Sequence, residues 1–277
     1  MNDMETTRES WNIATRNHNK HKGDQAAFFR AGGDVLFPEE LELLGELTGK
    51  SVVHLQCNSG QDTLGLARRG AEVLGVDFSD EAVGFARALS EASGIGAEFV
   101  ESEVVTWLNS TERRFDLAFS SYGVVGWLPD LRSWANGVAR VLKPGGAFVY
   151  VEFHPLVWSF GPGFMANKDD YFEEQPFREP VGDYVAASGE ALGAVVGEGA
   201  VETVENHVPA TAYQYGVGQV VTALAEAGLR LEVLREYPFA NGCRVHPELV
   251  PEAGRRFVMP AGRPRIPLMF GLRVRKA

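Results

Sequence analysis

Residues 51–77 combine a polar loop and an acidic residue at the spacing used to bind a nucleoside. The loop contains Gln56, Asn58 and Gly60, and Asp77 follows it by about 20 residues, the offset at which a carboxylate after a strand binds ribose hydroxyls. A dinucleotide-binding loop has glycine at three positions, and only Gly60 satisfies this pattern. The loop alone therefore fits two interpretations, a nucleoside-binding loop and an ordinary turn from strand to helix.

The elements that must position these residues follow from the apolar pattern. Five strands are predicted, two within residues 51–77 and one each within residues 94–104, 115–122 and 142–155. Apolar side chains recur at helical spacing between residues 130 and 142, where a Pro-Gly-Gly turn precedes the fifth strand. In an open parallel sheet, ligands bind beyond the carboxyl ends of the strands, which is where the polar residues lie.

This succession resembles the class I S-adenosylmethionine-dependent methyltransferases that act on small molecules. The sequences GVDFSDEAV and LKPGG carry the resemblance, which covers residues 49–155 and extends to the last helix and closing strands. It implies an α/β fold with a Rossmann-like, seven-stranded, mostly parallel sheet covered by helices on both faces. The loop is an HLQC variant, because His54, Gln56 and Asn58 replace the family's usual acid and first two glycines. Gln and Asn side chains can hydrogen-bond the methionyl end of the cofactor.

The resemblance also implies roles for individual residues in binding S-adenosylmethionine and its product S-adenosylhomocysteine. Asp77 would bind the ribose hydroxyls, Phe78 one face of the adenine, and Glu103 with the backbone of Val104 the adenine amino edge. The remaining cofactor residues would be Gly60 for close backbone approach, Gln56, Asn58, Gln61 and Asp62 around the methionyl group, Ser120 beneath the sulfur, and Trp11 from the N-terminal segment. Asp62 also suits the first turn of a helix, where an acid complements the helix dipole.

Methyl transfer needs chiefly alignment and the exclusion of water, and a base only for an oxygen, carbon or protonated nitrogen acceptor. His154 is the candidate base, since it ends the fifth strand and imidazole titrates near neutral pH, although it could simply cap that strand. Glu152 would orient His154 or be structural. Tyr122 would touch the substrate or methionyl group, or pack as an aromatic. Weaker candidates are His207, Tyr213 and Tyr215.

The sequence predicts one domain, residues 1–277, in four parts. They are an N-terminal cap (1–40), the cofactor-binding core (41–155), an insertion after the fifth strand that forms a lid (156–215), and the C-terminal part of the core (216–277). Aromatic content without low complexity favours an ordered lid. The cap has an alternative interpretation as an amphipathic helix on the sheet, with Phe28 and Phe29 in the core.

Bulk properties narrow the function. A net charge of −11 without a clear cluster of lysine and arginine argues against nucleic acid as a partner. No apolar run is long enough to span a membrane, and two cysteines form no disulfide framework or zinc pattern, so a reducing, cytoplasmic location is expected. His18 and His21 are expected to be solvent-exposed or to touch substrate, and no metal site is expected. The sequence does not indicate an oligomeric state.

These observations favour S-adenosylmethionine-dependent methyl transfer to an O, N or C atom of a small organic metabolite, in a setting such as specialised metabolism. One alternative is an NAD-dependent oxidoreductase, which would need three loop glycines and a Tyr-x-x-x-Lys pair that the sequence lacks. The other is a non-catalytic protein that binds an adenosyl ligand. The presence of both Asp77 and Glu103 at the required offsets argues against it.

Overall fold

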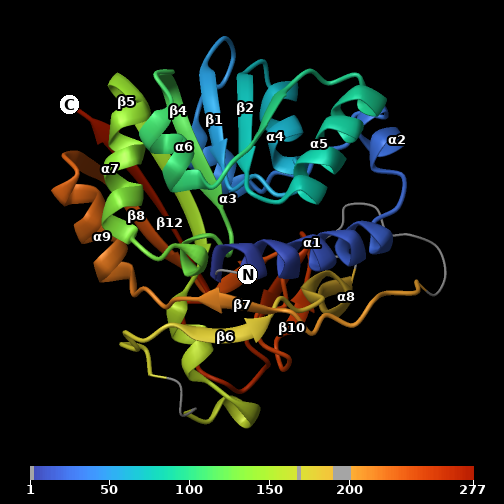
Figure 1. Ribbon diagram of the computed structural model, residues 1–277. Coiled ribbons are helices and arrows are strands. Elements are labelled where there is room, and N and C mark those ends of the chain that lie inside the picture. The colour runs from blue at the N-terminus through green and yellow to red at the C-terminus, as the bar shows by residue number, and fades with distance from the viewer. Residues whose placement is uncertain (1–2, 167–169, 190–200) are drawn as a thin grey trace.

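A seven-stranded sheet forms the centre of the computed structural model, which describes residues 3–166, 170–189 and 201–277. Its strands are β1 (Ser51–Leu55), β2 (Glu72–Asp77), β3 (Glu98–Glu101), β4 (Phe115–Ser121), β5 (Leu142–Phe153), β8 (Leu229–Tyr237) and β12 (Met269–Lys276). The order is β3-β2-β1-β4-β5-β12-β8; β12 is antiparallel to both β5 and β8, and all other neighbouring pairs are parallel (Figure 1). The predicted Rossmann-like, mostly parallel sheet is confirmed.

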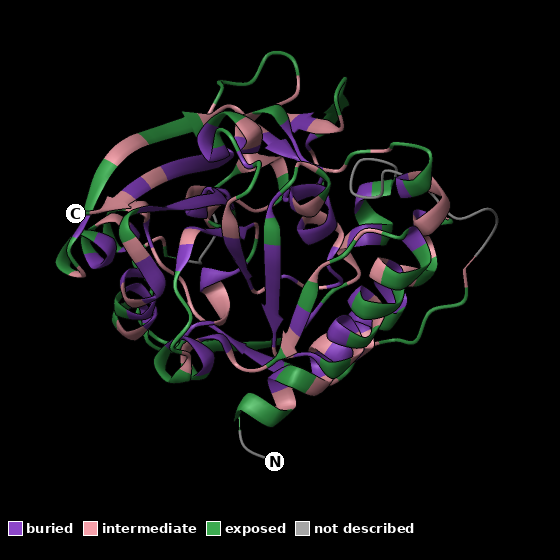
Figure 2. Cartoon of the chain, turned by 90° about the horizontal axis from the view of Figure 1, so that it is seen from above, coloured by how far each residue is buried: buried purple, intermediate pink, exposed green. Residues whose placement is uncertain are grey.

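Helices cover both faces of this sheet because alternate strand residues are apolar on both sides. Val52 packs with α3 (Pro38–Leu44) and α4 (Gln61–Arg68), whereas its neighbour Val53 packs with α6 (Val104–Ser110), α7 (Leu131–Val141) and α9 (Val217–Glu226). The shorter α2 (Gln25–Arg30) packs beside α5 (Asp80–Ser93), which adjoins β2 and β3. Figure 2 shows the resulting buried layer through the middle of the molecule.

The Pro-Gly-Gly turn lies inside the first residues of β5 and not before the strand. Gly145 has a φ of 74°, and the pairing of β4 with β5 shifts register between Phe115 and Leu117. At Gly146 an added Cβ would lie 2.9 Å from the carbonyl oxygen of Lys143. The turn therefore requires glycine to let β5 change direction as it enters the sheet.

The cap and the insertion meet beyond the sheet. Helix α1 (Asp3–His21) lies between the central sheet and a two-stranded ribbon formed by β6 (Phe177–Pro180) and β7 (Pro209–Ala212) (Figure 1). The insertion also contains η2 (Pro155–Ser159), η3 (Pro162–Phe164) and α8 (Tyr184–Ser188). Residues 167–169 and 190–200 of the predicted lid lie outside the described residues.

A third sheet departs from the sequence-based prediction. The sequence predicts residues 216–277 as the C-terminal part of the core. Residues 239–258, which lie between β8 and β12 in the chain, are instead outside the central sheet. They form β9 (Phe239–Asn241), β10 (Val250–Glu252) and β11 (Arg256–Val258), in the order β10-β11-β9. Phe257 and Ala240 anchor this sheet on Phe153 and Leu268, so it sits next to the carboxyl end of β5.

No helix in the described part of the chain is both long and apolar enough to cross a bilayer.

Candidate functional site

A cavity of about 1080 Å³ lies beyond the carboxyl ends of β1, β2 and β4, and is enclosed by α1, the insertion and the third sheet. This volume is at the upper end of the range for small-molecule pockets, so it has room for two ligands. Most predicted cofactor residues line it: Trp11, Gln56, Asn58, Gln61, Asp62, Asp77, Phe78, Glu103 and Val104. Tyr122, Tyr213 and Tyr215 line it as well.

Asp77 is fixed by the backbone at the end of β2. Its Oδ2 accepts a hydrogen bond from the Asn58 N–H at 2.8 Å, and its Oδ1 accepts one from the Ser79 N–H at 3.0 Å. The side chain is 7% exposed, and burial raises the pKa of its carboxyl group to about 6. Each oxygen keeps a further acceptor position that can face a ligand.

Glu103 has a structural role that the sequence analysis did not assign. Its carboxylate caps α6 by accepting hydrogen bonds from the N–H groups of Val105 at 2.8 Å and Thr106 at 2.7 Å. This is the usual way to satisfy the free donors of a first helical turn. Any contact of Glu103 with an adenine would therefore use the lone pairs that the cap leaves over.

The loop after β1 obtains its shape without the usual glycines. Gln56 and Asn58 adopt left-handed backbone conformations, with φ of 54° and 48°. The Nε2 of Gln56 donates to the carbonyl oxygen of Val124 at 2.9 Å, which ties the loop to the end of β4. Gly60 does not line the cavity; an added Cβ there would lie 2.7 Å from the Cβ of Ala86, so the glycine allows α5 to approach. Gly60 therefore permits close helix packing, and not the close backbone approach to a ligand that the sequence predicted.

Four polar side chains gather on the cavity wall around the start of α4: Lys22, Asp62, Ser121 and Arg255. Asp62 lies in the first turn of α4 and accepts a hydrogen bond from the Ser121 hydroxyl at 3.2 Å. Burial raises the pKa of Asp62, whereas Lys22 and Arg255 lower it. Burial lowers the pKa of Lys22 to about 8, and Asp62 opposes this shift. Lys22 follows α1 directly and is not among the residues predicted for the site. Its position after a helix with a polar face is the only sequence signal for it.

Aromatic side chains of the cap and insertion meet over the loop. Trp11 contacts Trp127 edge-on, with ring centroids 5.3 Å apart, and Tyr184 of α8 at 6.3 Å. The hydroxyl of Tyr184 interacts with the Asn58 side chain, and burial raises its pKa well above the usual value. The insertion thus reaches the cofactor loop directly.

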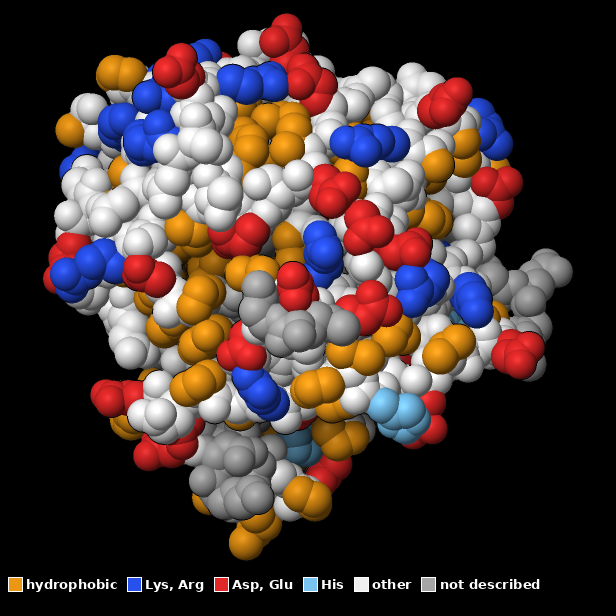
Figure 3. All heavy atoms as spheres, in the orientation of Figure 1, with side chains coloured by type: hydrophobic (Ala, Val, Ile, Leu, Met, Phe, Trp, Pro, Cys, Tyr) orange, Lys and Arg blue, Asp and Glu red, His pale blue; other side chains and the backbone are white. Residues whose placement is uncertain are grey.

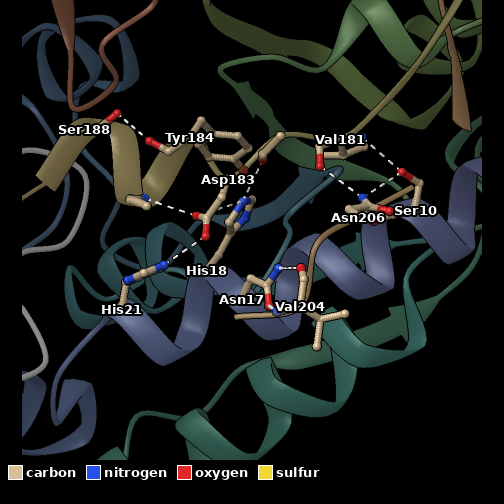
Figure 4. Close-up of polar contacts among 12 residues, drawn as sticks. Ser10, Asn17, His18, His21, Val181, Asp183, Tyr184, Ser188, Val204 and Asn206 are labelled. Carbon is tan, nitrogen blue, oxygen red and sulfur yellow. Dashed lines mark hydrogen bonds and ion pairs between the residues drawn. The ribbon is translucent and has the colours of Figure 1, made fainter. Parts of the chain in front are cut away.

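Polar contacts join α1 to the insertion (Figure 4). The Nε2 of His18 lies 3.1 Å from the carbonyl oxygen of Gly182, and the Nε2 of His21 lies 2.9 Å from the carboxylate of Asp183. Burial lowers the pKa of His18 to about 4. The expectation that these histidines are solvent-exposed or touch substrate is wrong, because both hold the insertion. No group of acidic, histidine or cysteine side chains suited to a metal occurs among the described residues.

Comparisons with known proteins show what the chain is similar to. Residues 52–146 match the model of a methyltransferase domain. An uncharacterized methyltransferase of Synechocystis sp. is 37% identical over 139 residues, 49% of this chain and 63% of that protein. A ubiquinone biosynthesis O-methyltransferase of Alkalilimnicola ehrlichii is 33% identical over 109 residues, 39% of this chain and 44% of that protein. The chain thus matches less than two thirds of the length of these relatives.

The fold agrees with a solved relative. The S-adenosylmethionine-dependent methyltransferase from Mesorhizobium loti superposes with a TM-score of 0.57 at 21% identity, over 86% of this chain and 96% of that one. Residues 52–146 thus match a methyltransferase domain within a fold of this kind.

The contacts of His154 correct its candidate role. His154 does not line the cavity; its Nε2 lies 3.0 Å from the Oε1 of Glu236 on β8, and its Nδ1 accepts from the Leu156 N–H at 3.2 Å. Both ring nitrogens are thus engaged away from the cavity. The expectation that His154 reaches the reacting atoms is wrong, and Glu152 does not orient it.

Glu152 instead shapes the cavity wall. Its carboxylate accepts hydrogen bonds from the N–H groups of Gly123 at 2.5 Å and Val124 at 2.9 Å, and from the Tyr150 hydroxyl at 2.8 Å. Burial raises the pKa of Glu152, and these donors lower it. The structural interpretation of this acid therefore fits the contacts.

Two other candidates lie away from the cavity. Ser120 is fully buried, and its hydroxyl donates to the carbonyl oxygen of Leu55 at 3.2 Å, so the neighbouring Ser121 faces the cavity in its place. His207 is exposed, with its Nε2 3.4 Å from the carboxylate of Glu205.

Hydrophobic side chains gather on the lower half of the face in Figure 3, where Figure 1 places the insertion.

Proposed function

We propose that the chain transfers the methyl group of S-adenosylmethionine to an oxygen, nitrogen or carbon atom of a small organic molecule, such as an intermediate of specialised metabolism. The observation that carries the proposal is Asp77, a buried carboxylate held by two backbone N–H groups at the carboxyl end of β2, inside a matched methyltransferase domain. This is the position from which an acid binds ribose hydroxyls in such sheets.

The cavity wall fits a large polar ligand. Four buried polar atoms on it have no hydrogen-bond partner in the described part of the chain: Trp11 Nε1, Thr15 Oγ1, His54 Nε2 and Gln56 Oε1. Buried polar groups are nearly always hydrogen-bonded in folded proteins, so these atoms call for a partner from outside the chain. Burial lowers the pKa of His54 to about 3, which makes it a neutral donor or acceptor.

The side chains divide the cavity into subsites in this proposal. Asp77 holds the ribose, Phe78 and Val104 hold the adenine, and Gln56, Asn58 and Gln61 surround the methionyl group. Lys22 and Asp62 carry opposite charges that complement its carboxylate and ammonium groups. Bound S-adenosylmethionine supplies an electrophilic methyl group. The protein aligns the acceptor with it and excludes water.

The walls beyond these subsites favour an aromatic or apolar acceptor. Phe153, Phe160 and Trp127 line the rest of the cavity, together with Tyr213 and Tyr215. Relatives named for ubiquinone biosynthesis and for demethylmenaquinone methylation have small-molecule acceptors in their names, which supports the same class here.

S-adenosylhomocysteine is expected to raise the melting temperature of the protein, because a ligand that binds only the folded state stabilises it. At a concentration 100 times its Kd, the stabilisation is about 2.7 kcal/mol. Differential scanning fluorimetry with millimolar ligand measures the shift, and NAD serves as the control. A shift with NAD and none with S-adenosylhomocysteine would favour the oxidoreductase. A shift with S-adenosylhomocysteine but no turnover with any acceptor would favour a non-catalytic binding protein.

Asp77→Ala is expected to weaken S-adenosylhomocysteine binding by about 1.5–3 kcal/mol, since hydrogen bonds to a charged group are the strong ones. Wild-type affinity should also fall as the pH drops through about 6, where Asp77 becomes protonated. Isothermal titration calorimetry gives both results. Glu101→Ala, an exposed acid at the end of β3, is the matched control and should bind normally. Binding by Asp77→Ala within twofold of wild type would remove Asp77 from the ribose site.

A further inference from the structure

Glu40 is a buried acid with an unused oxygen next to the cavity. It is 1% exposed in α3, and its Oε2 accepts a hydrogen bond from the Phe37 N–H at 2.8 Å. Its Oε1 is buried and has no hydrogen-bond partner in the described part of the chain. The polar groups that face it are the Tyr122 hydroxyl, Asp62 of α4 and Arg255 of the turn between β10 and β11. A buried oxygen without a hydrogen bond lowers the stability of the folded protein.

Tyr122 connects this acid to the cavity. It follows β4 in a left-handed conformation with a φ of 46°, and its N–H donates to the carbonyl oxygen of Val151 at 2.8 Å. Its ring stacks on Phe153 at 5.1 Å and contacts Phe37 edge-on at 6.4 Å. A left-handed bulky residue is uncommon outside sites that need a fixed side chain. Tyr122 lines the cavity, whereas Glu40 does not.

Asn241 determines where the Tyr122 proton points. The Nδ2 of Asn241 donates to the Tyr122 hydroxyl oxygen at 3.1 Å and to the Oε2 of Glu39 at 3.1 Å. The Tyr122 oxygen therefore acts as an acceptor toward Asn241, which leaves its own proton available to another acceptor. The Glu40 carboxylate interacts with this hydroxyl and has the free oxygen. One lone pair of the Tyr122 oxygen remains for a ligand in the cavity.

We propose that Tyr122 and Glu40 form a proton relay that accepts the proton of a phenol-type hydroxyl group on the methyl acceptor. The inference rests on the proposed methyl transfer. The acceptor O–H bond breaks as its proton passes to the Tyr122 oxygen, while the Tyr122 proton passes to the ionised Glu40. The acceptor oxygen forms the new O–CH₃ bond, and the electron pair of the broken S–CH₃ bond stays on sulfur. Glu40 ends protonated and returns its proton to solvent after product release.

The class of acceptor follows from the similar pKa values of Glu40 and a phenol. Burial, with a contribution from Asp62, raises the pKa of Glu40 to about 8. A base of this strength can take a proton from a phenol, whose pKa is about 10, because the two values are close. The aromatic walls formed by Phe37, Phe153 and Phe160 also suit a flat ring. Tyr122 would touch the acceptor, and Glu40 would act through it as a positioning residue.

The test uses a flat phenol-type molecule, 1-naphthol, as the acceptor for the labelled methyl group of S-adenosylmethionine. We expect transfer to 1-naphthol, with a kcat that rises with pH through about 8, where Glu40 ionises. Glu40→Gln and Tyr122→Phe should each lower kcat for 1-naphthol about a hundredfold, change KM little, and remove this rise. Glu42→Gln, an exposed acid of α3 paired with Arg235, is the matched control and should behave as wild type.

A second readout needs no turnover. The urea midpoint of Glu40→Gln should exceed that of wild type at pH 8 and approach it at pH 5, because only the wild type must take up a proton or bury a charge at this position when it folds. The relay is overturned if Glu40→Gln keeps the wild-type kcat and pH profile, or if 1-naphthol receives no methyl group. If S-adenosylhomocysteine still binds, either result leaves the proposed cofactor site in place. If the wild type does not bind S-adenosylhomocysteine, the proposed function itself is overturned.

Discussion

Replacing Glu152 with alanine is expected to lower the free energy of unfolding by about 3–5 kcal/mol. The substitution leaves the N–H groups of Gly123 and Val124 and the Tyr150 hydroxyl without their buried acceptor. Hydrogen bonds to a charged group contribute about 1.5–3 kcal/mol each and do not add fully, and an unpaired buried donor costs about 1–3 kcal/mol. Urea denaturation of both proteins measures the difference.

Glu236→Ala is the control for this substitution. Glu236 is a 57% exposed carboxylate on β8 whose contact is with His154. Exposed ion pairs contribute about 0–1 kcal/mol, so this variant should unfold close to the wild type. Equal unfolding midpoints for Glu152→Ala and wild type would show that water replaces the carboxylate and that Glu152 does not hold the loop after β4.

Glu40→Gln is expected to be more stable than the wild type by about 3 kcal/mol at pH 7. The carboxyl group has a pKa of about 8 in the folded protein, against 4.5 for the model value. Between these values the folded state holds a proton that the unfolded state releases, so wild-type stability falls as the pH rises from about 4.5 to about 8. A shift of one pKa unit corresponds to about 1.4 kcal/mol. Glutamine does not titrate and therefore carries no such penalty.

The pH dependence distinguishes this effect from better packing. The stability difference should shrink below about 1 kcal/mol at pH 5, where Glu40 is largely protonated in the folded state and partly protonated in the unfolded state. Urea titrations at pH 5, 7 and 8 give the comparison. Glu42→Gln should show no such trend. A difference that is the same at all three pH values would mean that Glu40 does not carry a raised pKa.

The sequence predicted the parts of the fold and site that depend on local patterns. Asp77 could be found because a strand ends there and the loop lies about 20 residues before it. The strands, the Pro-Gly-Gly turn and helix α7 likewise follow from apolar spacing and turn residues. Each of these signals is contained in a short stretch of chain.

Other features depend on contacts between distant segments. His154 lies at the predicted edge of the sheet, but its direction is set by Glu236, 82 residues later. Glu40 lies in the first turn of a helix, whereas the groups that influence its pKa, Tyr122 and Arg255, come from distant parts of the chain. The strands of that sheet have three residues each, too few to show alternation.

Helix α1 is fastened on two sides, and this affects how long a ligand stays bound. Toward the core, Asn12 bonds Ser79 and Asp80, and Asn19 bonds Ser59. Toward the insertion, it is held through His18 and His21. Exchange of a ligand beneath α1 requires contacts on one of these sides to break. The residence time of the spent cofactor, and with it the interval between turnovers, then becomes a property of this helix.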